Sequence, residues 1–179
     1  MPFGRAETAT GKLVGHVFAS SWDCDDDVVG WISQLVVDKE YRRRGVATTL
    51  VASLKEASLF AKVTVVGVAS SHPVTCYVVS KLGQTPLENI DTKFISDRAP
   101  RILSSAPVDY IRSASLRGQL FQAEDASGAV SSVDTQFPID HTGPLNALVT
   151  LKERKGWCLG ELLEGHEFLL ICPMKSRAK

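Results

Sequence analysis

The feature that constrains this chain most is a pair of β-strand patterns joined by a helix pattern. Residues 28–37 are rich in apolar and β-branched residues, and residues 62–69 form a second, nearly continuous β-branched run. Between them, over residues 45–60, apolar side chains recur at helical spacing. A strand, a helix and a strand in succession form a βαβ unit, so we expect the two strands to be parallel with a right-handed crossover.

The junction between the first strand and the helix carries an anion-binding pattern. Three arginines, Arg42, Arg43 and Arg44, are followed by Gly45 and Ala47. The first N–H groups of a helix lack intrahelical partners and carry the positive end of its dipole. Glycine lets backbone approach a bulky anion closely. The pattern therefore predicts a diphosphate-binding turn; the competing interpretation is a surface helix start with a solvated basic patch.

This junction resembles that of the GNAT superfamily, the GCN5-related acyl-CoA N-acyltransferases. In that family an Arg/Gln-x-x-Gly-x-Gly/Ala turn between a central strand and the next helix binds the pyrophosphate of coenzyme A. Arg42, Gly45 and Ala47 occupy its three defined positions. The resemblance implies an α+β fold, a mixed twisted sheet with helices on both faces, and acetyl-CoA or coenzyme A as cofactor. The His-Glu-Phe-Leu-Leu ending and the Ser-Ser-His-Pro turn resemble poorly characterised fungal GNAT-like proteins.

The resemblance also implies which residues contact the cofactor. Pantetheine in the family hydrogen-bonds the strand before the turn, as an added strand would. His72 matches the first position of the helix motif that follows the second strand, beside the pantetheine arm, although a helix-capping histidine is the competing interpretation. The remaining positions are Leu35, Val36 and Val37 for pantetheine, and Arg43, Arg44, Gly45, Val46, Ala47 and Thr48 for the diphosphate.

Catalytic side chains are not identified by the sequence. The family often places a carboxylate or a histidine on the central strand to accept the proton of the amine. Residues 28–37 contain no Asp, Glu or His, and only Ser33 and Gln34 are polar. A tyrosine that often protonates the thiolate corresponds to Val79, and Tyr77 lies about 200° away around a helix. Deprotonation through water, or by a base from another element, stays open.

The remaining patterns predict further elements. Strands are expected near residues 3–8 and 13–22, separated from residue 28 by a tight acidic loop at 23–27. Helices are expected over 73–82, closed by Gly83, and over 107–121. A third helix is expected over 145–155, with Thr142-Gly143-Pro144 as its start signal and Gly156 as its end signal. Residues 157–163 and 166–172 flank the hairpin signal Glu164-Gly165. An alternative pairing joins a strand at 129–137 to 166–172.

These elements predict a single domain over residues 1–179. Its core spans 12–83, a helical insertion spans about 84–163, and a closing strand spans about 166–172. By comparison with the family, we expect a first strand and two helices to be missing. The wall of the acceptor site is then expected to come from the insertion or from a partner, for which a homodimer is one option.

Composition limits the class of partner. The chain has 179 residues, with 20 Lys and Arg against 20 Asp and Glu. A formal net charge of zero argues against nucleic acid or an anionic membrane as partner. The four cysteines have no metal-ligand spacing, so we expect reduced thiols, no metal site and a cytoplasmic location.

The expected function is acyl-CoA-dependent N-acetylation of a small amine, by direct transfer from the thioester. The alternative is a GNAT-fold protein that binds acyl-CoA without acetyl transfer, or a repurposed biosynthetic enzyme. A nucleotide phosphate binder of another fold is less favoured, because the sequence has no Walker-type G-x-x-x-x-G-K motif.

Overall fold

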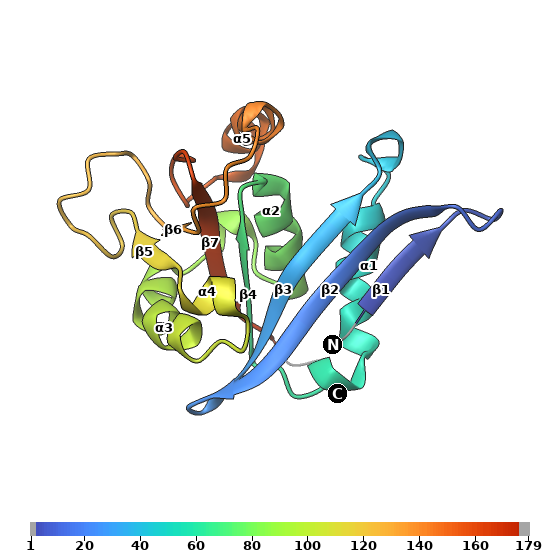
Figure 1. Cartoon of the computed structure of the whole chain (residues 1–179), viewed down its shortest axis with the longest axis horizontal. Coiled ribbons are helices and arrows are strands. Elements are labelled where there is room, and N and C mark those ends of the chain that lie inside the picture. The colour runs from blue at the N-terminus through green and yellow to red at the C-terminus, as the bar shows by residue number, and fades with distance from the viewer. Residues whose placement is uncertain (1–2, 176–179) are drawn as a thin grey trace.

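The computed structural model describes residues 3–175, and its centre is a seven-stranded sheet in the order β1-β2-β3-β4-β7-β6-β5 (Figure 1). Within these residues β3 and β4 are parallel, and the other neighbouring strands are antiparallel. The α+β class, the mixed sheet and the parallel βαβ pair are confirmed. The strands are β1 (Phe3–Glu7), β2 (Leu13–Cys24), β3 (Asp27–Val37), β4 (Val65–Ser70), β5 (Ser115–Arg117), β6 (Ser132–Asp134) and β7 (His166–Pro173).

Helices cover both faces of this sheet. The side chains of β7 point alternately to the two faces. Cys172 lies against Gly83 at the end of α2, whereas its neighbour Ile171 packs beside Trp31 on the face of α3. None of the helices within residues 3–175 has the length and apolar character needed to cross a membrane. The helices are α1 (Val46–Ser53), α2 (Pro73–Leu82), α3 (Thr92–Ser104), α4 (Asp109–Arg112) and α5 (Thr142–Lys155).

Helix α1 is shorter than predicted. It ends at Ser53, whose hydroxyl donates to the Leu50 carbonyl at 2.7 Å, and the chain continues in two short 3-10 turns separated by the extended Ala57. This break carries Phe60 into the core, where its ring lies over Gly30 of β3. Burial of Phe60 against Gly30 therefore ends the helix earlier than the spacing of apolar residues predicts.

The middle of the chain differs most from the prediction. Helix α3 was not expected; it begins at Asp91, whose carboxylate accepts the Phe94 N–H at 3.1 Å, and it buries Ile95 and Ile102. Pro100 lies inside α3 and obscures the helical pattern, since proline removes a backbone donor. The predicted helix over 107–121 is wrong, because only α4 is helical there and β5 follows it.

The acidic loop at 23–27 is also corrected. Strands β2 and β3 continue through it and leave only Asp25 and Asp26 in the turn. Arg98 of α3 forms an ion pair with Asp27, and Arg101 forms one with Asp25. The Trp22 indole N–H donates to Ser105 at 3.1 Å. These contacts hold α3 against the β2–β3 hairpin.

The C-terminal region confirms one prediction and overturns another. Helix α5 ends at Gly156, whose φ of 61° is left-handed, as expected. The hairpin of 157–163 with 166–172 is wrong, because β7 pairs with β4 and β6, and residues 157–163 supply only a bridge at Gly160. The alternative pairing is confirmed, although β6 is shorter than 129–137. Helix α2 ends at Leu82 as expected, but the left-handed residue is Gln84 rather than Gly83.

The parallel pair depends on a close contact between Gly67 and Trp31. A Cβ at Gly67 would come within 2.6–2.7 Å of the fully buried Trp31 ring. We expect Gly67→Ala to lower the free energy of unfolding by about 1–3 kcal/mol, because it overpacks this contact. Urea denaturation measures the change.

Gly143→Ala in the first turn of α5 is the matched control. A Cβ there meets no atom within 4 Å, so this variant should be neutral or slightly stabilising. Equal stability of the two variants would contradict the contact.

Candidate functional site

The candidate site begins where β3 and β4 separate. Their parallel pairing comprises only Val29 with Val65, Gly30 with Val66, and Trp31 with Gly67. Beyond these pairs β3 continues beside β2 and β4 continues beside β7, and Figure 1 shows the two strands diverging. Within residues 3–175, the edge of β3 that faces β4 therefore has no strand partner from residue 32 onward. Such an edge can accept the hydrogen bonds of an extended ligand.

A β-bulge at Ser33 accounts for this separation. Phe18 of β2 pairs with Gln34, but the next residue, Ala19, pairs with Ile32, so Ser33 is an extra residue in β3. A bulge bends its strand and increases the local twist. The bulge at Ser33 lies two residues after Trp31, which forms the last parallel pair with Gly67. It therefore turns β3 away from β4 at the point where pairing ends.

A cavity of about 130 Å³ lies between the separated strands. It is smaller than typical pockets for whole cofactors, which are roughly 300–1,000 Å³. It fits the reactive end of a long ligand whose remainder follows the strand edge. The cavity is lined by Ile32, Ser33, Gln34 and Leu35 of β3, by Val68, Ala69 and Ser70 of β4, by Thr75 of α2 and by Glu167 of β7.

The arginine-rich turn lies at the far end of β3 and exposes helix N–H groups. Arg43 and Gly45 are left-handed, with φ of 61° and 79°. Thr49 is the first residue of α1 to donate along the helix, to the Gly45 carbonyl at 3.0 Å. No side chain caps the start of α1, and its first turn has no acidic residue. The N–H groups of Val46, Ala47 and Thr48 therefore lack intrahelical partners, as an anion site requires.

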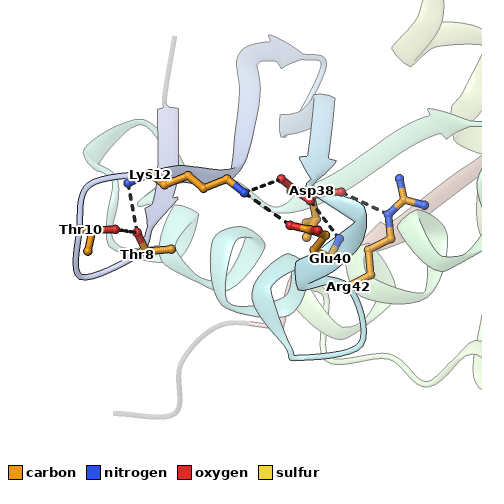
Figure 2. Close-up of polar contacts among 7 residues, drawn as sticks. Thr8, Thr10, Lys12, Asp38, Glu40 and Arg42 are labelled. Carbon is orange, nitrogen blue, oxygen red and sulfur yellow. Dashed lines mark hydrogen bonds and ion pairs between the residues drawn. The ribbon is translucent and has the colours of Figure 1, made fainter.

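Polar contacts brace this turn against the strands (Figure 2). The Lys12 ammonium lies 3.5 Å from Asp38 and 3.6 Å from Glu40, which ties the β1–β2 turn to the end of β3. The Arg42 Nε donates to the Val37 carbonyl at 3.2 Å. The Glu40 N–H bonds the Asp38 carboxylate and lowers its pKa. The Arg44 guanidinium lies 5.2 Å from the centre of the Tyr41 ring.

His72 lies between the end of β4 and the start of α2. It is the N-cap residue of α2, but its side chain makes no capping hydrogen bond. Its backbone N–H donates to the Ser70 hydroxyl at 3.2 Å. Burial lowers the pKa of His72, and the charge of Arg42 lowers it further. Arg42, in the turn after β3, therefore shares an electrostatic environment with His72, which lies between β4 and α2.

The predicted pantetheine residues have different surroundings. Leu35 lines the cavity, whereas Val36 is 44% exposed and lies outside it. Val37 contributes the carbonyl that holds Arg42. Their contact with a cofactor stays a prediction. The helix position where the family often has tyrosine is the fully buried Val79.

Tyr77 does not replace that tyrosine. It lines a separate hollow of about 300 Å³ with Lys81 and Lys155, and both ammonium groups lie over its ring. No residue of this hollow lines the cavity between β3 and β4.

The sequence reasoning missed Glu167. It lies in β7, next to Phe168, which pairs with Ser70 at the end of β4. Burial raises the pKa of Glu167, and the Thr135 hydroxyl and the Ser71 N–H offset part of the rise. A lone carboxylate in the otherwise apolar run from 167 to 172 was the available signal.

The comparisons agree with the resemblance that the sequence carries. Residues 2–76 match the model of the acetyltransferase (GNAT) family, which confirms the resemblance over this part of the chain. The matched residues include strands β1 to β4 of the mixed sheet, with its parallel pair. No curated protein matches the chain.

Several solved structures match with low overall similarity. An aminoglycoside acetyltransferase from an uncultured soil metagenomic sample is 31% identical over 35% of this chain and 43% of its own, with a TM-score of 0.32. The NatB acetyltransferase complex bound to a bisubstrate inhibitor is 20% identical over 45% of this chain and 47% of its own, with a TM-score of 0.40. N-acetylglutamate synthase from Neisseria gonorrhoeae, complexed with coenzyme A and N-acetyl-glutamate, is 10% identical over 97% of this chain and 26% of its own, with a TM-score of 0.41. The chain spans less than half the length of each.

The shared environment of Arg42 and His72 can be tested by titration. We expect Arg42→Ala to raise the pKa of His72, because a nearby cation no longer opposes protonation. The pKa should stay below the ordinary histidine value of about 6.5, since burial remains. NMR titration of the imidazole C–H signals measures it, with His72→Gln to assign the resonance. Lys39→Ala serves as control, and an unchanged pKa in Arg42→Ala would show that the two side chains do not interact.

Proposed function

We propose that this chain is an acyl-CoA-dependent acyltransferase, and more narrowly an N-acetyltransferase that acts on a small amine. One arrangement carries the proposal: the arginine-rich turn and the open strand edge lie in line along β3. Coenzyme A has an anionic diphosphate followed by an extended amide-bearing arm. A helix N-terminus suits the first and an unpaired strand edge suits the second. The family match of residues 2–76 supports this assignment.

In this proposal the cofactor follows β3 from the turn to the cavity. The diphosphate binds the N–H groups of Val46, Ala47 and Thr48, with Arg42 and Arg44 supplying charge. Pantetheine runs along the open edge of β3. Its thioester then reaches the cavity of about 130 Å³, which is large enough for the reacting end alone.

The chemistry is direct attack of the amine on the thioester carbonyl. Holding both reactants in place can remove roughly 7–11 kcal/mol of the barrier. A backbone N–H on the open edge of β3 would stabilise the oxyanion of the tetrahedral intermediate. Four cysteines without disulfides are compatible with the cytoplasmic location that we propose.

A second candidate is a protein that binds acyl-CoA without transferring the acyl group. It is favoured by the absence of ionisable side chains in the part of β3 that lines the cavity, residues 32–35, and by the fully buried Val79. Turnover of acetyl-CoA with any amine would decide against it.

Calorimetric titration tests the cofactor site. The unmodified chain should bind acetyl-CoA more tightly than 3′,5′-ADP, which lacks the pantetheine arm. Arg42→Ala combined with Arg44→Ala should weaken acetyl-CoA binding about tenfold or more, because hydrogen bonds to charged groups contribute about 1.5–3 kcal/mol each.

The matched control removes the same charge elsewhere. Arg5→Ala with Lys93→Ala deletes two exposed cations, each in a surface ion pair that contributes little to stability. This control should leave the affinity within about twofold. Equal affinity of the Arg42/Arg44 variant and the control would overturn the assignment of the turn.

A further inference from the structure

We propose that Glu167 of β7 is the general base that removes the proton from the acceptor amine, a role that rests on the acyl transfer proposed above. The base then comes from the closing strand of the sheet and not from the strand that binds the cofactor. The acceptor amine accordingly approaches from the face of the sheet that α3 and α4 cover.

The register of the sheet brings Glu167 to the reacting end of the cavity. Strand β7 is antiparallel to β4, so its first residues lie beside the end of β4. Phe168 pairs with Ser70, and Glu167 is one residue further toward the open end of the separation. Its side chain lines the cavity together with Ser33 and Gln34 of β3. The carboxylate and the open strand edge therefore face one space.

Alternation along β7 assigns the face on which Glu167 lies. Side chains alternate between the two faces of a strand, so Glu167, Leu169 and Ile171 share a face. Ile171 packs beside Trp31 and Gly67, on the side of α3. Phe168 points the other way and packs against Trp157, with ring centres 4.7 Å apart.

The surroundings of Glu167 suit a proton acceptor. Burial raises the pKa of its carboxyl group, which makes the carboxylate a stronger base than an exposed one. Glu167 forms no ion pair with another residue of the described chain. The charge of Glu167 acts on two titratable groups, the Tyr110 phenol of α4 and, from the other face of the sheet, the Cys76 thiol of α2. Burial raises the pKa of both, which disfavours their ionised forms.

Other candidates for the base are less suitable. His72 does not line the cavity, and Arg42 disfavours its protonation. His16 of β2 bonds Gln34 at 3.0 Å and also lies outside the cavity lining. The Cys76 thiol is fully buried in α2.

The proposed step balances as follows. The amine nitrogen attacks the thioester carbonyl carbon, and a C–N bond forms. The proton of the resulting ammonium passes to the Glu167 carboxylate. The tetrahedral intermediate collapses, the C–S bond breaks, and the coenzyme A thiolate leaves. That thiolate takes a proton from the Glu167 carboxyl group or from water, so the products are the amide and coenzyme A thiol, and Glu167 is ionised again.

The test measures coenzyme A thiol release from acetyl-CoA with phenethylamine, butylamine and putrescine as acceptors, from pH 5 to 9. Glu167→Gln should lower kcat/KM about 100-fold or more, the usual contribution of a general base. It should leave acetyl-CoA affinity within about twofold by calorimetry. It should also remove the part of the acidic fall in kcat/KM that exceeds the fall due to protonation of the amine itself. Glu167→Asp, which keeps the carboxylate, should recover part of the rate.

Glu164→Gln is the matched control, because Glu164 is exposed in the turn before β7 and does not line the cavity. It should retain the wild-type rate and pH profile. Thermal unfolding of Glu167→Gln separates a catalytic loss from a folding defect, and this isosteric variant should unfold at the wild-type temperature or higher.

Two results would overturn the proposal in distinguishable ways. Wild-type turnover with an equally active Glu167→Gln refutes the role of Glu167 and leaves acyl transfer standing. A wild-type chain that binds acetyl-CoA but releases no thiol with any of these amines refutes acyl transfer and the base together.

Discussion

The separation of β3 from β4 after Trp31 is the constraint on which the rest of the site depends. Pairing up to Trp31 holds the βαβ unit together, and the bulge at Ser33 then turns β3 away. Backbone donors and acceptors that a continuous sheet would satisfy internally remain open along one edge. That edge joins the arginine-rich turn to the cavity. The one extra residue, Ser33, therefore places the turn and the cavity along the same strand edge.

Local chemistry explains which parts were predictable. The turn from Arg42 to Ala47, the start of α2 at Pro73 and the end of α5 at Gly156 depend on neighbouring residues, and the sequence reasoning placed them correctly. The length of α1 was not predictable in this way, because the need to bury Phe60 against Gly30 lies outside the helix.

Long-range pairing explains what was missed. Helix α3 depends on ion pairs between Arg98 and Asp27 and between Arg101 and Asp25, across more than 70 residues. Glu167 joins the cavity only because β7 inserts between β4 and β6. The family pattern pointed to a base on residues 28–37, whereas the Glu167 carboxylate comes from the last strand of the chain, which pairs with β4. The contacts of the predicted cofactor residues with coenzyme A stay predictions.

The short β3–β4 ladder divides the sheet into two parts with separate tasks. One part, β1 to β3, bears the arginine-rich turn and the bulge. The other, β4 with β7, β6 and β5, bears Glu167 and lies next to α3 and α4. Within the sheet only three residue pairs join them. Substitutions in the second part can therefore reshape the space beside Glu167 while the turn keeps its geometry. If the proposed acyl transfer holds, the choice of acceptor can diversify independently of the cofactor.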